Sequence, residues 1–298
     1  MIAGTALAGD PARLGTILSS WQLDYGITSA LIVSAGLYVW GVRRVRRRSG
    51  VGSHQRSRTV LFVTGLGVIY LALQSPIDTY SGLLLSVHMV QHLMLTMVAP
   101  PLLLAGAPIT LALQAASTET RRRILLPVLR SRAVRFASLP ALGWGLFAAV
   151  MWATHFSSFY ETALENGRIH ILEHAAYQGA ALLFWRPVIA VDPAPTRLSH
   201  PARIFYLFLA MPVTTFLGLA IYGSDRLLYP AYLRASLLVG ANPLSDQHLA
   251  GAIMWVSSMV LLLPALGYVL VDWMRREDRE GERVDARLAR ASADPRVR

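Results

Sequence analysis

Apolar residues gather in seven long stretches along the chain, and short polar segments separate them. The stretches lie at 26–42, 59–75, 82–104, 139–156, 169–190, 203–222 and 247–272. A helix needs about 20 mainly apolar residues to cross the hydrocarbon core of a bilayer. The pattern therefore predicts an all-α, polytopic membrane protein with seven transmembrane helices. Four of the stretches are short, so flanking residues or local thinning of the bilayer would have to help them cross.

Prolines interrupt three of the predicted helices. Pro100-Pro101 lie near the end of the third stretch, Pro212 lies in the sixth and Pro264 in the seventh. Proline lacks a backbone N–H, and its ring crowds the preceding turn of a helix. We therefore expect the third helix to break or kink at Pro100-Pro101, and the other two helices to be kinked.

The composition agrees with a membrane protein. Of the 298 residues, 54% are hydrophobic and 15% are charged, whereas soluble proteins carry about 25% charged residues. The net charge of +11 comes from 28 basic residues, all of them arginine, against 17 acidic ones. Seven arginines fall at 43–58, six at 121–135, three at 186–203 and eight from 275 onward. We interpret these clusters as cytoplasmic segments rather than as a nucleic-acid surface, because each lies between or after apolar stretches.

The arginine clusters also predict the orientation of the chain. If all four clusters face the cytoplasm, the N-terminus lies outside and the C-terminus inside, which an odd number of spans requires. We expect an external segment at 1–25, a seven-helix transmembrane domain at 26–274 and a charged cytoplasmic tail at 275–298.

The histidines lie on one side of the predicted membrane. Two of the eight, His54 and His200, fall in the arginine-rich cytoplasmic loops. The others occupy the outer halves or outer ends of the predicted helices: His88, His92, His155, His170, His174 and His248. Ionisable side chains inside a membrane are costly and usually functional. The placement therefore predicts a functional site in the outer half of the membrane.

The spacing of these histidines favours a metal site. His88 and His92 are four residues apart, as are His170 and His174, so each pair shares one helix face and could chelate one ion. The chain has no Cys, which excludes disulfides and thiolate ligands. One such pair is often a pair of hydrogen-bonded packing residues, but two pairs at one membrane level indicate metal binding.

Three methionines and one aspartate extend the candidate ligand set. Met89, Met151 and Met254 lie near the same level, and imidazole together with thioether suits copper, whereas zinc does not take thioether ligands. Asp246 could bind the metal or cap the seventh helix. Glu173 precedes His174, and we expect it to point elsewhere on the helix, where it could fix the tautomer of another imidazole.

Three blocks of the sequence carry further motifs. The first is His88-Met89-Val90-Gln91-His92 followed by Ala99-Pro100-Pro101, Gly106 and Pro108. The second is Phe159-Tyr160 followed by His170 to His174, Gly179, Trp185 and Pro187, and the third is the segment at 246–255 with Asp246, His248, Met254 and Trp255. Together these blocks resemble the polytopic CtaG family of cytochrome c oxidase assembly factors. The resemblance implies a seven-span protein of the bacterial inner membrane that is linked to copper supply. It also implies Cu(I) or Cu(II) as the bound metal, and a cytochrome c oxidase subunit and an external copper carrier as partners.

The residues leave two other functions open. A seven-span zinc hydrolase could combine three histidines with an activated water, and a b-type cytochrome could hold haem between two facing histidines. Six histidines exceed the three ligands usual for catalytic zinc, and no histidine lies in the inner half to hold a second haem. We therefore expect a copper-binding assembly factor that is not an enzyme. Its predicted ligands are His88, His92, His155, His170, His174, His248, Met89, Met151, Met254 and Asp246.

Overall fold

The computed structural model describes residues 20–49, 55–156 and 166–292, and within these ranges every regular element is a helix. The assignments made from the sequence at 1–19, His54, Phe159-Tyr160 and 293–298 lie outside the described residues.

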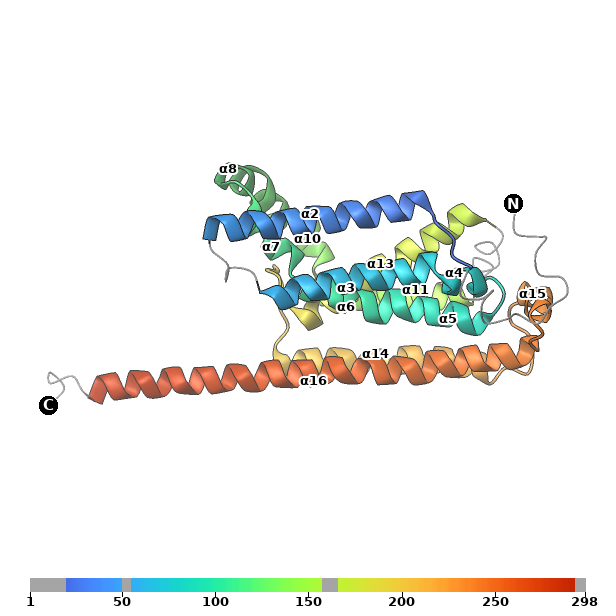
Figure 1. Ribbon diagram of the computed structural model, residues 1–298. Helices are drawn as coiled ribbons and strands as arrows, with labels where there is room; N and C mark the ends of the chain where they lie inside the picture. The colour runs from blue at the N-terminus through green and yellow to red at the C-terminus, as the bar shows by residue number, and fades with distance from the viewer. Residues whose placement is uncertain (1–19, 50–54, 157–165, 293–298) are drawn as a thin grey trace.

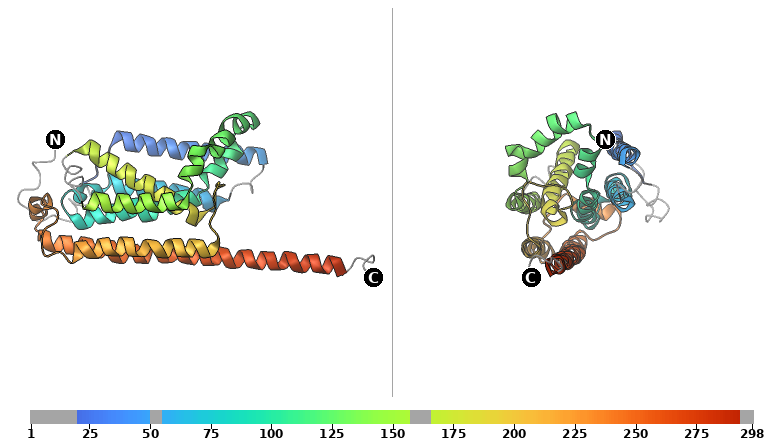
Figure 2. Two further views of the ribbon diagram at one scale, coloured as in Figure 1. Left: turned by 180° about the vertical axis from the view of Figure 1, so that it is seen from behind. Right: turned by 90° about the vertical axis from the view of Figure 1, so that its left-hand side faces the viewer.

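Each of the seven apolar stretches forms a helix in this structure. These long helices lie side by side along a common axis (Figure 1, Figure 2). They are α2 (Tyr25–Ser49), α3 (Arg56–Gln74), α5 (Leu85–Leu93) continued through the π-helical turn η1 (Met94–Val98) into α6 (Ala99–Ala105), α11 (Pro140–His155), α13 (Gly167–Ile189), α14 (His200–Tyr222) and α16 (Pro243–Ser292). Shorter helices connect them: α4 (Pro76–Ser81), α7 (Pro108–Ala115), α8 (Thr118–Thr120), η2 (Arg121–Leu125), α9 (Leu126–Arg130), α10 (Arg132–Ala137) and α15 (Tyr232–Leu238).

Five helical runs in the described part of the chain are long and apolar enough to cross a membrane. They cover Tyr25–Arg48, Arg56–Gln74, Leu85–Ala115, His200–Tyr222 and Pro243–Ala286. The two remaining predicted spans correspond to α11 and α13. Helix α11 has 16 residues, and the first half of α13 carries the polar side chains of His170, Glu173, His174 and Gln178.

The bundle presents apolar side chains outward and polar side chains inward. On α14, Phe205, Phe208 and Phe216 are each at least 60% exposed, whereas Gln91 of α5 and Glu173 of α13 are almost completely buried. A soluble protein rarely exposes a continuous apolar surface of this kind. The distribution fits helices that are surrounded by lipid.

The helix does not break at Pro100-Pro101, since α6 runs through both prolines directly after the π-helical turn η1. The missing N–H of Pro100 would leave the carbonyl of Thr96 without its usual helical donor. The indole Nε1 of Trp185 on α13 donates to that carbonyl at 2.8 Å instead. The π-helical turn η1, in which the N–H of Ala99 donates to the carbonyl of Met94, absorbs the extra residue before the prolines. Pro212 and Pro264 also lie inside helices that continue through them.

Two glycines bring α14 and α16 into backbone contact. A Cβ atom placed on Gly218 would lie 2.7 Å from the N of Trp255, and one on Gly251 would lie 2.5 Å from the N of Tyr222. Small residues at such a crossing allow two membrane helices to approach closely. At the far end of the same pair, Asp272 accepts hydrogen bonds from Arg203 and His200, each at 3.1 Å.

The two ends of the bundle carry different groups. One end holds α4, α15 and the beginning of α5, and the other holds α8 and the end of α2 (Figure 1). Helix α16 starts at the first end and runs past the second as a single 50-residue helix, which at 1.5 Å per residue is about 75 Å long. The arginines in the last turn of α2 and those of η2 and α9 therefore gather at the second end, together with the charged part of α16.

Candidate metal centre

Five of the predicted histidines converge from three helices. His88 and His92 come from α5, His155 from the last turn of α11, and His170 and His174 from the first two turns of α13. The ring centroids are 4.1 Å apart for His88 and His92 and 4.3 Å for His170 and His174, and the two pairs lie 5.9–6.0 Å from each other. His92 is central, because its ring also lies 6.1 Å from that of His155. We call these five residues the histidine cluster.

Helix geometry explains why α5 and α13 contribute pairs. Residues four apart lie one above the other on a helix, so His88 and His92 face α13 together, and His170 and His174 face back. The close contact of α11 with α13 places His155 beside them. Gly143 allows this contact, because a Cβ atom there would lie 2.6 Å from the carbonyl oxygen of Leu183.

Glu173 joins the histidine cluster, contrary to the expectation that it points elsewhere on the helix. One carboxylate oxygen of Glu173 and one ring nitrogen each of His88 and His92 all lie within 4.8 Å of one another. Three ligands at about 2.0–2.2 Å from one ion lie about 3.4–3.6 Å apart in tetrahedral or trigonal geometry. These three side chains therefore need to close by about 1 Å to share a metal ion.

Several polar atoms of the cluster have no hydrogen-bond partner among the described residues. They are both ring nitrogens of His92, the Nε2 atoms of His155, His170 and His174, and both carboxylate oxygens of Glu173. Glu173 is 1% exposed and His92 and His155 are each 3% exposed. Leaving such groups buried and unpaired costs free energy, and a bound cation would offset this cost for those that it contacts.

The backbone orients His155 so that one nitrogen is available. Its Nδ1 lies 2.6 Å from the carbonyl oxygen of Met151, so Nδ1 carries the proton and donates to that oxygen. The Nε2 atom is then the lone-pair donor of the ring. Such a hydrogen bond on the far nitrogen commonly fixes the tautomer of a histidine that binds metal.

Tyr177 is a buried residue of the site that the sequence analysis did not identify. Its ring centroid lies 4.3 Å from that of His92, and its hydroxyl bonds with Thr154 and lies 3.3 Å from the Nδ1 of His155. Tyr177 follows His174 by three residues, as Glu173 follows His170. Residues three apart share a helix face, so this spacing is the sequence signal that could have revealed Tyr177.

Asp246 lies apart from the histidine cluster. Its Oδ2 accepts a hydrogen bond of 2.6 Å from the N–H of Leu85, and its Oδ1 accepts one of 2.5 Å from the hydroxyl of Ser86. Asp246 thus caps the N-terminus of α5 and not its own helix α16. In this role it fixes the start of the helix that carries His88 and His92.

His248 also lies outside the histidine cluster. Among the described residues, its ring forms no contact with the ring of another histidine. Its Nε2 lies 3.1 Å from the carbonyl oxygen of Ser224, and its ring lies 5.9 Å from that of Tyr222. The predicted methionine ligands Met89, Met151 and Met254 are at most 3% exposed and belong to the apolar core.

A cavity connects the histidine cluster with the end of the bundle at which α4 lies. Its volume is about 310 Å³, and it is lined by Gln22, Leu23, Asp24, Ile27, Leu73, Asp78, His170, Ile171 and His174. Two carboxylates, those of Asp24 and Asp78, face this cavity, and no arginine is among the described residues that line it. Burial raises the pKa of the Asp78 carboxyl, and a 2.7 Å hydrogen bond from Gln91 opposes this rise. The cavity gives a cation an acidic route to His170 and His174.

The five imidazoles and the Glu173 carboxylate are groups that bind transition metals, and the chain has no Cys that could supply a thiolate ligand. Imidazole suits zinc, copper, iron and nickel, and a buried carboxylate neutralises part of the ion's charge. The five imidazoles and Glu173 exceed the four ligands of a tetrahedral site. The cluster therefore offers an ion more than one position along its length.

Comparison with known proteins gives a family for the chain. The family described as cytochrome c oxidase caa3 assembly factor (CtaG) matches residues 36–276. Uncharacterized proteins of Mycobacterium bovis and Mycobacterium tuberculosis are each 29% identical to the chain over 282 residues, which is 92% of this chain and 42% of the relative. An uncharacterized protein of Mycobacterium leprae is 28% identical over 291 residues, which is 95% of this chain and 44% of the relative.

The chain thus spans less than half the length of the curated relatives it matches. No solved structure matches it. The family match covers all of the helices that form the histidine cluster, from α5 through α13. The chain belongs to the family of cytochrome c oxidase caa3 assembly factors.

Proposed function

We propose that this protein binds copper in the histidine cluster and supports formation of a copper centre in a haem–copper cytochrome c oxidase. The observation that carries the proposal is the convergence of His88, His92 and Glu173 within 4.8 Å in a buried site. A cytochrome c oxidase contains copper, and imidazole ligands hold copper without thiolate. On this proposal copper is the cargo of the protein.

The topology belongs to the same proposal. All seven long helices cross the membrane, with the N-terminal end outside and α16 ending in the cytoplasm. Two observations support this orientation: the arginines gather at one end of the bundle, and the histidine cluster lies toward the opposite end (Figure 1). Basic residues favour the cytoplasmic side. The acidic cavity at Asp24 and Asp78 then opens outward, toward copper delivered by an external carrier.

The partners follow from this placement. An oxidase subunit that receives copper at the outer half of the membrane would meet the outer end of this bundle. On this proposal the chain is a multi-pass protein of the inner membrane. Its external segment is 1–25, its transmembrane domain is 26–274 and its cytoplasmic tail is 275–298.

Metal analysis of the purified full-length chain tests the proposal. The protein is incubated with copper or zinc, dialysed and analysed for both metals, together with the variants His92→Ala, His248→Ala and His200→Ala. We expect copper to be retained by the wild type and by the last two variants, because neither His248 nor His200 touches the cluster. We expect His92→Ala to lose it, because the ring of His92 contacts three other histidines. Retention of zinc without copper would overturn the proposal, and equal loss from all three variants would move the site elsewhere.

A further inference from the structure

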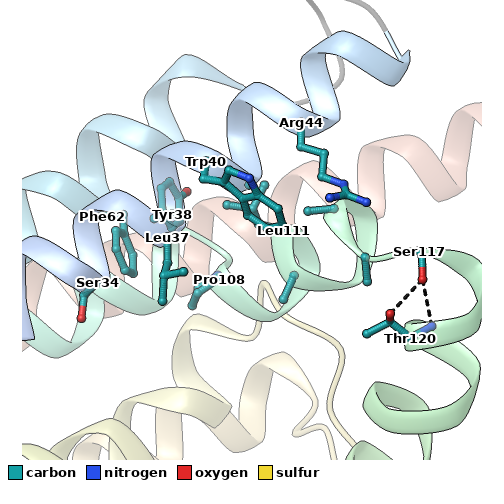
Figure 3. A pocket seen from close by; sticks show the side chains of 14 residues that line it. Ser34, Leu37, Tyr38, Trp40, Arg44, Phe62, Pro108, Leu111, Ser117 and Thr120 are labelled. Atoms are coloured by element: carbon teal, nitrogen blue, oxygen red, sulfur yellow. Dashed lines mark hydrogen bonds between the residues drawn. The ribbon is translucent and has the colours of Figure 1, made fainter.

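A larger cavity lies at the end of the bundle opposite the acidic cavity. It is a groove of about 560 Å³ between α2 and α7, within the range of roughly 300–1,000 Å³ that is typical of ligand pockets. Figure 3 shows its lining, which is mostly apolar: Ser34, Leu37, Tyr38, Trp40, Gly41, Arg44, Phe62, Pro108, Leu111, Ala112, Ala115, Ala116, Ser117 and Thr120. None of these residues belongs to the histidine cluster.

The back wall of the groove is held in place by tight contacts. The rings of Tyr38 and Phe62 stack at 4.0 Å, and the hydroxyl of Tyr38 donates to the carbonyl of Gly106 at 2.6 Å. A Cβ atom on Gly41 would lie 3.2 Å from the side chain of Leu111, so α2 and α7 approach closely there. The wall is therefore formed in advance of any ligand.

The front of the groove is open and apolar. Leu37 is 64% exposed and Trp40 is 54% exposed. Both belong to α2, one of the helices long and apolar enough to cross a membrane. In a bilayer these side chains face lipid, so the groove opens sideways to the acyl chains.

One end of the groove is positively charged. The guanidinium of Arg44 lies 5.1 Å from the centre of the Trp40 ring, and its Nε is buried without an acceptor in the described part of the chain. Arg48 donates to the carbonyls of Ala115 and Ala116 at 3.4 and 3.3 Å, which places a second cation beside the same end. Ser117 and Thr120 add two hydroxyls there (Figure 3).

The neighbouring charges reinforce this end of the groove. Residues 43–48 hold five arginines, and residues 121–123 hold three. The sequence has no acidic residue at 43–77, and its only acidic residue at 107–135 is Glu119. Its carboxylate already pairs with Arg123 at 3.1 Å. Within the described residues neither Arg44 nor Arg48 forms an ion pair with a carboxylate, so this apolar groove complements a molecule with a long hydrocarbon tail and an anionic head.

We propose that this groove binds one anionic phospholipid of the membrane, with an acyl chain between α2 and α7 and the phosphate at Arg44. Basic pockets between helices on the cytoplasmic side of a membrane recognise such head groups, and tryptophan commonly lies at head-group level beside them. The bound lipid bridges α2 to α7, which leads through the short helix α8 into η2 and α9, where Arg121, Arg122, Arg123 and Arg130 lie. The proposal does not depend on copper binding.

Lipid retention by the purified protein tests this assignment. The full-length chain is exchanged from detergent micelles containing equal amounts of phosphatidylglycerol and phosphatidylcholine, and the lipid that stays bound is measured by mass spectrometry. We expect phosphatidylglycerol to be retained preferentially, and Arg44→Gln to lower its retention about fivefold, as expected for one arginine contact at a membrane surface. Ala112→Trp, which fills the groove without changing the charge, should abolish retention of the lipid.

Arg43→Gln is the matched control. Arg43 is the neighbour of Arg44, is exposed and does not line the groove, so we expect this variant to retain lipid as the wild type does. Three results would overturn the proposal: equal retention of phosphatidylcholine and phosphatidylglycerol, equal loss in Arg43→Gln and Arg44→Gln, or full retention in Ala112→Trp. Displacement of the lipid by inorganic phosphate alone would also overturn it, because a free anion would then suffice.

Discussion

Glu173 is a buried carboxylate without a hydrogen-bond partner among the described residues, and such a group is costly to bury. Glu173 is 1% exposed, and neither of its oxygens accepts a hydrogen bond from the described residues. Removing an ionised carboxylate from water costs several kcal/mol unless a cation or donor compensates. Its position within 4.8 Å of ring nitrogens of His88 and His92 makes a shared metal ion the natural compensation.

We predict that Glu173→Gln weakens copper binding at least 10-fold, since amide oxygen is a poorer ligand than carboxylate and brings no negative charge. The loss of a supporting group around a metal typically costs 10–100-fold in affinity. Competition with a copper chelator measures the change. The metal-free variant should melt no lower than the metal-free wild type, because a buried ionisable group without a partner among the described residues has been removed.

Glu119→Gln provides the control for this prediction. Glu119 is exposed and pairs with Arg123 on the opposite end of the bundle, so copper affinity should not change. Unaltered copper affinity in Glu173→Gln would show that the carboxylate is not a ligand.

At this scale the sequence predicted which histidines lie together in pairs. The spacing of four residues correctly paired His88 with His92 and His170 with His174. Glu173 and Tyr177 follow His170 and His174 by three residues, a second spacing that also brings side chains to one helix face, and the four-residue spacing of the histidines does not contain it. The contacts of Asp246 with Leu85 and Ser86 depend on how α16 packs against α5, and no pattern within one segment contains that information.

At the scale of the helices, the apolar pattern predicted where the long helices lie in the sequence better than it predicted where they end. The stretch at 139–156 became α11 at Pro140–His155, but the stretch at 247–272 became the first half of α16, which continues to Ser292. The charged residues after 272 support a helix through pairs of opposite charge and are not apolar, so hydropathy alone could not detect the extension. The helix through Pro100 persists because Trp185, far away in the sequence, supplies the missing donor.

The contact between α14 and α16 gives a prediction at the same scale. Gly251→Ala should lower the stability of the bundle by about 1–3 kcal/mol, the usual cost of overpacking, because the new Cβ would lie 2.5 Å from the backbone of Tyr222. Gly267→Ala on the same helix is the control, since no atom lies within 4 Å of its Cβ position. Thermal melting in detergent compares the two variants. Equal melting temperatures would mean that the helices can separate at the glycines without cost.

At the scale of the whole molecule, the arrangement of charges predicts how the protein lies in the membrane. The natural absence of Cys makes the test direct, because each introduced thiol is then the only one in the chain. We predict that Leu125→Cys and Pro195→Cys are protected from a membrane-impermeant maleimide in intact spheroplasts, and that Ala163→Cys is labelled. Labelling of Leu125→Cys from outside would reverse the orientation and place the histidine cluster on the cytoplasmic side.

The last prediction joins the site to the oxidase. If the histidine cluster supplies copper, deleting the gene should leave oxidase subunits and haem in place but reduce copper-dependent respiration when copper is scarce. Supply follows mass action, so added external copper should partly restore respiration by filling a weaker direct route. A strain carrying His92→Ala should behave like the deletion, because the ring of His92 contacts those of His88, His155 and His174. A strain carrying His248→Ala should respire normally, since His248 bonds to Ser224 away from the cluster. Respiration measured across a copper titration separates these outcomes, and full activity of the deletion strain at limiting copper would refute the role in copper supply even if the purified protein binds the metal.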